Sequence, residues 1–210
     1  MRPDRAEWSD RLDRLVREVG APLGHKLLYG PWDTIDRGHV AFISANPGLG
    51  PPSEESHALD EPAGNSYRVG RARTLSPLTE QFLAMATFLG ADPDDILTGV
   101  ANPLRSRSLA ELTQAQASAG RALATEFWRA ALAYRPRTLV IACSALATRV
   151  ARDATGATLA GSIPAGWGRV RIRLYATGNG ARVVQLPHLS RYRLFGRPAS
   201  EAALASALRT

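Results

Sequence analysis

The chain has 210 residues, of which 26 are basic and 19 acidic, and its formal net charge is +7. No linker or low-complexity tract divides it, so we expect residues 1–210 to form a single domain with one sizeable core. Lys26 is the only lysine, which argues against mechanisms that need a Schiff-base lysine or a phosphate-loop lysine. The charge is thus almost entirely arginine, which suits planar contacts with phosphates and bases. A genome-wide bias towards arginine and alanine explains the same charge equally well.

Cys143 is the single cysteine and follows an apolar run, so neither a disulfide nor a cysteine-ligated metal site is expected. The first five residues lack the apolar core of a signal peptide, and no stretch approaches the length of a membrane span. We therefore expect a cytoplasmic protein that does not contact a membrane. We also expect a monomer.

The first half of the chain alternates helix-like and strand-like patterns. Apolar residues at three- and four-residue spacing predict helices, and short apolar runs bounded by turn residues predict strands. In chain order the expected elements are a helix over 4–18, a strand over 39–43, a polar loop over 49–74, a helix from Ser76-Pro77 to 89 and a strand over 96–101.

The second half continues the alternation. The expected elements are a long helix over 108–134, a strand over 138–142, a helix over 144–155, a strand over 170–175, a strand over 183–186 and a short helix over 200–208. The turn Gly178-Asn179-Gly180 predicts that the last two strands pair antiparallel, at the edge of the sheet. Strands that alternate with helices predict an α/β fold, a three-layer α/β/α sandwich with a central, mostly parallel sheet.

Two loops follow apolar strands and contain the candidate catalytic residues Asn46 and His188. The carboxyl ends of strands are where open α/β sheets bind ligands. In the first loop, the rigid Pro47 fixes Asn46, whose amide can hold a water molecule in place but is too weak a base to deprotonate it. Gly48 lets a ligand approach the backbone. An Asn-Pro-Gly sequence is also an ordinary turn, and that interpretation stays open.

The second loop carries a histidine beside a hydroxyl and two arginines. A neutral His188 can donate a hydrogen bond to an anion that develops on a leaving group, while Ser190, Arg191 and Arg193 can hold phosphate. A structural loop histidine is the alternative.

These loops resemble those of the uracil-DNA glycosylase superfamily. In that family an Asp-Pro or Asn-Pro loop after the first strand positions the attacking water, and a later loop, usually reading His-Pro-Ser, supplies a histidine and a minor-groove wedge. Ala45-Asn46-Pro47-Gly48 resembles the mismatch-specific and single-strand-selective branches, and residues 189–196 are similar to the segment after the histidine in the classical enzymes. The sequence departs from the family where it reads Pro187-His188.

The resemblance implies a DNA glycosylase that flips out uracil or another deaminated base and hydrolyses its bond to the sugar, with DNA as partner and without metal or cofactor. It implies roles for further residues. These are substrate binding by Ala45 and Gly48, base stacking on Tyr67, base-edge recognition by Asn102, insertion of Leu189 or Arg191 into the vacated stack, and phosphate binding by Ser190, Arg191 and Arg193.

Two alternatives remain open at this stage. One is a DNA- or nucleotide-binding protein that keeps a glycosylase-like fold but has lost turnover. The other is a hydrolase that uses the acidic loop, whose side chains suit metal binding or general-base catalysis. That loop contains Glu54, Glu55, His57, Asp60 and Glu61. A solvated loop explains the same residues.

Overall fold

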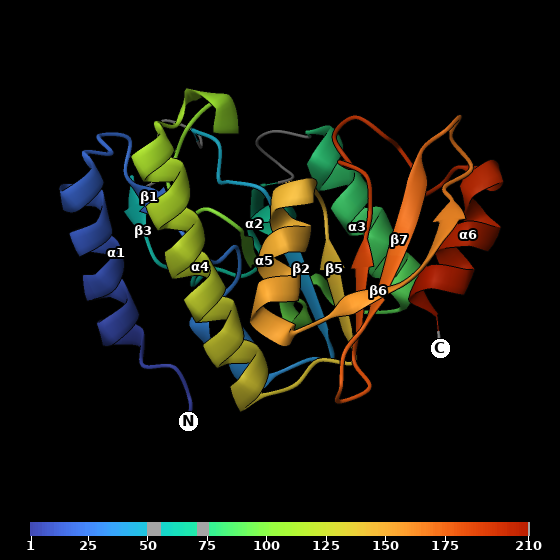
Figure 1. The fold of residues 1–210 in the computed structure, drawn as a ribbon, viewed down its shortest axis with the longest axis horizontal. Coiled ribbons are helices and arrows are strands. Elements are labelled where there is room, and N and C mark those ends of the chain that lie inside the picture. Colours follow the sequence, from blue (N-terminus) through green and yellow to red (C-terminus); the bar gives the residue numbers. More distant parts are fainter. Residues whose placement is uncertain (50–55, 71–75, 210) are drawn as a thin grey trace.

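The structure is a computed structural model, and it describes residues 1–49, 56–70 and 76–209. Helices and strands alternate along the chain (Figure 1). They are α1 (Arg5–Val19), β1 (His25–Lys26), η1 (Trp32–Asp36), β2 (Val40–Ser44), β3 (His57–Ala58), α2 (Ser66–Val69), α3 (Pro77–Leu89), η3 (Pro93–Asp95), β4 (Leu97–Val100), η4 (Leu109–Glu111), α4 (Gln114–Tyr134), β5 (Leu139–Ala142), α5 (Ala145–Thr155), β6 (Thr158–Pro164), β7 (Arg171–Ala176), β8 (Arg182–Gln185) and α6 (Pro198–Leu208).

A six-stranded sheet forms the centre of the molecule, with the strand order β4-β2-β5-β8-β7-β6. The first four strands pair in parallel, whereas β7 pairs antiparallel with both β8 and β6. The prediction of an α/β chain with a central, mostly parallel sheet is confirmed. β1 and β3 form a separate, short parallel pair.

Helices cover both faces of this sheet (Figure 1). Side chains of α1, α4 and α5 form one core together with Ala41 and Ile43 of β2. Side chains of α2, α3 and α6 form the other core with Phe42, because successive residues of a strand point to opposite faces. The arrangement is compatible with the predicted three-layer α/β/α sandwich.

Capping residues explain where the helices begin. Asp4 accepts a hydrogen bond from the backbone of Glu7 before α1, and Gly20 ends that helix with a φ of 60°. Ser76 caps α3 as expected. The predicted helix over 108–134 is wrong at its start, because Thr113 and Gln116 exchange hydrogen bonds in a capping box that fixes the first turn of α4.

The antiparallel pairing of residues 170–175 with 183–186 is confirmed, but β8 lies inside the sheet and not at its edge. The edge strand on this side of the sheet is β6, which the sequence pattern missed. Its first three residues are all exposed and the rest are no more than half-buried, so the strand has no alternation of apolar and polar residues.

Candidate functional site

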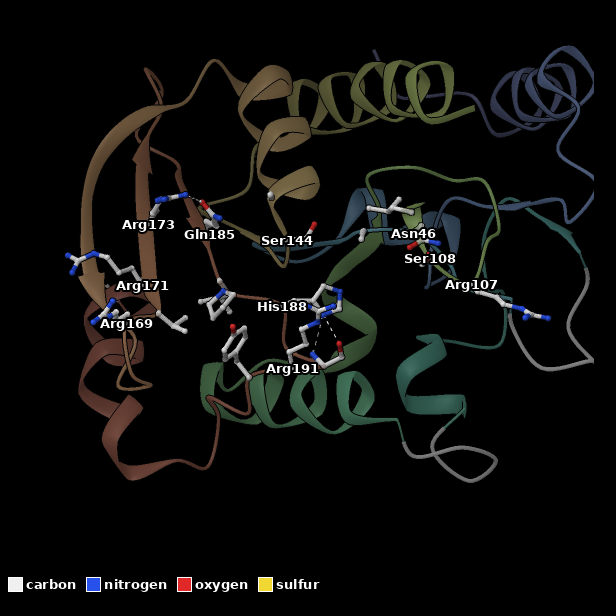
Figure 2. Close-up of a pocket in the computed structure, with 18 residues that line it drawn as sticks. Asn46, Arg107, Ser108, Ser144, Arg169, Arg171, Arg173, Gln185, His188 and Arg191 are labelled. Carbon is white, nitrogen blue, oxygen red and sulfur yellow. Dashed lines mark hydrogen bonds between the residues drawn. The ribbon is translucent and has the colours of Figure 1, made fainter. Parts of the chain in front are cut away.

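A pocket of about 690 Å³ lies at the carboxyl ends of β2, β5 and β8 (Figure 2). Both predicted loops line it, as expected from their positions after β2 and β8. The loop after β2 contributes Ala45 and Asn46, and the loop after β8 contributes Pro187, His188, Ser190, Arg191 and Tyr192. The remaining wall comes from residues 107–109, the first turn of α5, and the β7–β8 ribbon.

Asn46 is oriented by a single neighbour. Its Nδ2 donates to both the backbone oxygen and the Oγ of Ser106, each at 3.0 Å. Among the described residues Oδ1 has no hydrogen-bond partner, so it is the atom available to accept from a bound water or ligand. The backbone oxygen of Pro47 accepts from the Tyr29 hydroxyl at 3.0 Å, which holds the loop from its other side.

His188 is held through its Nδ1. The backbone N–H of Ser190 donates to this atom at 3.4 Å, and the Ser190 hydroxyl lies 2.7 Å from it. Because a backbone N–H can only donate, Nδ1 accepts and the proton of the neutral ring is on Nε2. Burial lowers the pKa of His188, and the positive charge of Arg191 lowers it further, so the ring is neutral near pH 7.

The lining is strongly basic. Five arginines line the pocket, and within the described part of the chain no acidic residue does; the arginines are Arg107, Arg169, Arg171, Arg173 and Arg191. All five are exposed. In addition, the N-terminal end of α5 opens into the pocket at Ser144 and Ala145, and a helix N-terminus has a partial positive charge. The pocket is therefore suited to a ligand with several negative charges.

No protein-family model and no curated protein matches this sequence. Within residues 1–49, 56–70 and 76–209, no helix is long and apolar enough to cross a membrane, and no group of three or more His, Cys, Asp or Glu is placed to hold a metal ion. The polar groups that line the pocket are amides, hydroxyls, one imidazole and guanidinium groups.

Several residues expected at the site lie elsewhere. Tyr67 is buried, and its ring stacks on Tyr29 with 5.1 Å between ring centroids. Asn102 is fully buried: its Oδ1 accepts from the backbone of Leu104 at 3.0 Å, and its Nδ2 donates to backbone oxygens of α4. In this structure both side chains support the fold and neither lines the pocket. Gly48 does not line it either, and its φ of 69° fits a turn residue.

In the loop after β8, some of the expected site residues are buried and others are exposed. Leu189 is fully buried and its backbone N–H donates to the Cys143 sulfur at 3.3 Å, so of the two expected wedges only Arg191 is exposed. Arg193 does not line the pocket, and it pairs with Glu80 at 2.9 Å. Burial raises the pKa of Cys143 to about 12, which keeps this thiol protonated as a core residue.

The acidic loop is a weaker candidate. Positions 54 and 55 lie outside the described residues. Asp60 is buried and binds both the Arg5 guanidinium at 2.7 Å and the backbone N–H of Trp32 at 2.9 Å. Glu61 pairs with Lys26 at 3.2 Å. These carboxylates already have structural partners.

The arginines of β7 were missed as site residues. The sequence does contain a signal for them, because Arg171 and Arg173 alternate with apolar residues in a strand-like run. Their nearness to the pocket follows from β8 lying between β5 and β7, which periodicity alone does not predict.

Proposed function

We propose that this protein hydrolyses the N-glycosidic bond of a damaged base in DNA, uracil or another deaminated base. One observation carries the proposal: Asn46 and His188, from loops far apart in the sequence, line the same arginine-rich pocket (Figure 2). One residue is suited to positioning a nucleophile and the other to stabilising a leaving anion. A volume of about 690 Å³ is within the range of small-molecule sites and admits a nucleotide.

Asn46 acts on the water. With Nδ2 fixed by Ser106, the free Oδ1 accepts a hydrogen bond from a water molecule and aims its oxygen at the sugar carbon. The amide does not remove a proton. It restricts the position of the nucleophile, which suffices when the sugar has already developed the character of an oxocarbenium ion. Once the water oxygen has bonded to the sugar carbon, its extra proton passes to solvent or to the departed base anion.

His188 acts on the leaving base. When the bond to the sugar breaks, its electron pair stays on the base, which becomes an anion. The Nε2–H of a neutral imidazole donates a hydrogen bond to that anion, and the Ser190 contacts at Nδ1 keep the donor proton on Nε2. The pocket arginines bind the phosphates that flank the flipped nucleotide.

The test is a panel of oligonucleotides that contain uracil, hypoxanthine or xanthine, incubated with the protein and then treated with alkali to cleave abasic sites. We expect cleavage at one or more lesions, and a loss of about a hundredfold or more in rate for Asn46→Ala and for His188→Ala. Arg14→Gln, an exposed change on α1, is the control and should leave the rate unchanged.

Two outcomes would contradict the proposal. One is binding to the oligonucleotides without release of any base, which would identify a nucleic-acid-binding protein without turnover. The other is a base-releasing activity that both alanine variants retain in full.

A further inference from the structure

Three exposed arginines occupy alternate sequence positions: Arg169 in the turn before β7, and Arg171 and Arg173 in β7 itself. Ile172, between the last two, is fully buried in the core on the opposite face of the sheet. All three arginines contribute to the outer wall of the pocket, and Figure 2 shows them following one another along the ribbon. We call these three residues the β7 arginine row.

Two of the three guanidinium groups of the β7 arginine row are held by neutral acceptors. Arg171 donates to the Oγ and the backbone oxygen of Ser162 on β6, at 2.7 and 2.6 Å. Arg173 donates to Oε1 of Gln185 at 3.4 Å. Within the described ranges no carboxylate pairs with any member of the row. Neighbouring cations without counter-ions repel one another, so an anionic ligand that bridges them is favoured.

No helix covers the row. On this side of the sheet α5 packs against β2, β5 and β8. Figure 1 shows β7 and β6 extending beyond α5 with no helix in front of them. The row therefore forms an open, basic surface that is continuous with the pocket.

We propose that the β7 arginine row binds successive phosphates of a single polynucleotide strand and leads that strand to the pocket. Arg171 and Arg173 are alternate residues of β7, which recur about every 6.8 Å along a strand, a spacing that neighbouring phosphates of an extended polynucleotide can match. Arg169 lies in the turn that leads into β7 and adds a third cation at the end of the row. The destination of the strand rests on the proposed function, whereas the binding of phosphates along β7 does not.

Aromatic rings stand where the row meets the pocket. Tyr192 lines the pocket and meets Trp167 edge to face, with 5.9 Å between centroids. Both rings are partly exposed. A basic row beside aromatic rings is the combination by which proteins bind single strands, since bases stack on the rings while phosphates meet the cations.

A row of cations that runs along one β-strand favours a single polynucleotide strand over a duplex. Each strand of B-form DNA makes a full turn in about 10 base pairs, so it curves away from a straight line of cations after one or two phosphates. An unpaired strand can follow the row over all three positions.

The test is the affinity for a fluorescent, undamaged oligothymidylate, measured by anisotropy over a range of salt concentrations. Single-strand affinity falls with salt by about 0.7 logarithmic units per tenfold change for each phosphate contact. For R169Q/R171Q/R173Q we therefore expect the slope to decrease by about 2. The matched control R14Q/R17Q/R135Q removes the same charge at exposed positions outside the pocket and should keep the slope. The variant R169K/R171K/R173K retains the positive charge and should therefore keep most of the salt slope as well.

The second measurement is the affinity for a DNA duplex of the same length. We expect it to bind at least about tenfold more weakly than the single strand, and to respond less to loss of the row. Equal salt slopes for R169Q/R171Q/R173Q and R14Q/R17Q/R135Q would overturn the proposal. Tighter binding of the duplex than of the single strand would overturn it as well.

The same samples separate this proposal from the proposed function. Suppose that no lesion in the panel is cleaved, and that R169Q/R171Q/R173Q lowers the salt slope while R14Q/R17Q/R135Q does not. Phosphate binding by the β7 arginine row is then supported and base excision is contradicted. If lesions are cleaved but both glutamine variants keep the salt slope of the unmodified protein, base excision is supported and phosphate binding by the β7 arginine row is contradicted.

Discussion

Asn46 and His188 are each fixed by one neighbouring serine. Ser106 occupies the amide nitrogen of Asn46 and leaves its oxygen free, and Ser190 occupies Nδ1 of His188 and leaves Nε2 as the donor. In both residues the anchored atom decides which atom remains available to a ligand. In the proposed mechanism the serines are positioning residues, because they act through the groups that they orient.

Ser106→Ala tests this role. The change removes one of the two acceptors of the Asn46 amide and leaves the backbone acceptor, so the residue should become less well oriented but not unfolded. We expect kcat for base release to fall about fivefold, as for the loss of roughly 1 kcal/mol, with KM nearly unchanged. Steady-state kinetics on a cleaved lesion measures both, and a change in KM alone would contradict the role.

His25 links folding to pH. It is buried, with Nε2 3.1 Å from Asp13 Oδ1 and Nδ1 3.2 Å from the backbone oxygen of Ala58. Burial lowers the pKa of His25 below its ordinary value of about 6.5, and the Asp13 carboxylate offsets this only in part. The unfolded chain thus binds this proton at a higher pH than the folded chain, and the free energy of unfolding should fall as the pH drops below about 6.5.

Urea unfolding at pH 7.5 and pH 5.5 measures that dependence. His25→Gln should make it weaker, whereas His39→Gln, at an exposed position, should leave it unchanged. The lowered pKa of His188 contributes in the same direction, so some dependence will persist. Identical dependence in the unmodified protein and His25→Gln would rule out a contribution from His25.

At the scale of elements, α4 sits directly on the turn after β4. A Cβ atom at Gly120 of α4 would lie 2.3 Å from Oδ1 of Asn102, whose amide bonds to backbone on both sides. Gly120→Ala should therefore lower the free energy of unfolding by about 1–3 kcal/mol, although alanine favours helices. Urea denaturation measures the change. Gly161→Ala, where a Cβ meets nothing within 4 Å, is the control and should be nearly neutral.

The elements that sequence predicted well are those with strong local signals. α1 shows both a capping residue and apolar periodicity, and β2, β4 and β5 are buried apolar runs. β6 was missed because an exposed edge strand needs no apolar alternation, and the start of α4 was missed because a capping box overrode an otherwise helix-compatible segment.

The site was only partly predictable for a different reason. Asn46 and His188 follow recognisable strands, so their place at the carboxyl ends of the parallel strands could be inferred. The burial of Asn102 and Leu189, and the approach of the β7 arginine row, depend on which elements pack together, and local sequence does not contain that information.

At the scale of the whole molecule, the strand order brings the candidate site residues together. Placing β8 between β5 and β7 brings the histidine loop beside the loop after β2 and puts the antiparallel ribbon against the same pocket. The residue proposed to position the nucleophile, the proposed donor to the leaving base and the arginines proposed to bind phosphate thus converge at the carboxyl end of the sheet.

Single-turnover release of the free base is the most direct measurement of base excision at this pocket. It compares the unmodified protein with His188→Ala on strands that contain uracil or 5-fluorouracil, whose anion is more stable and needs less help from His188. We expect the unmodified protein to release both bases, and His188→Ala to lose about a hundredfold in rate for uracil and distinctly less for 5-fluorouracil. Absence of release by the unmodified protein, or an equal loss for both bases, would contradict this mechanism.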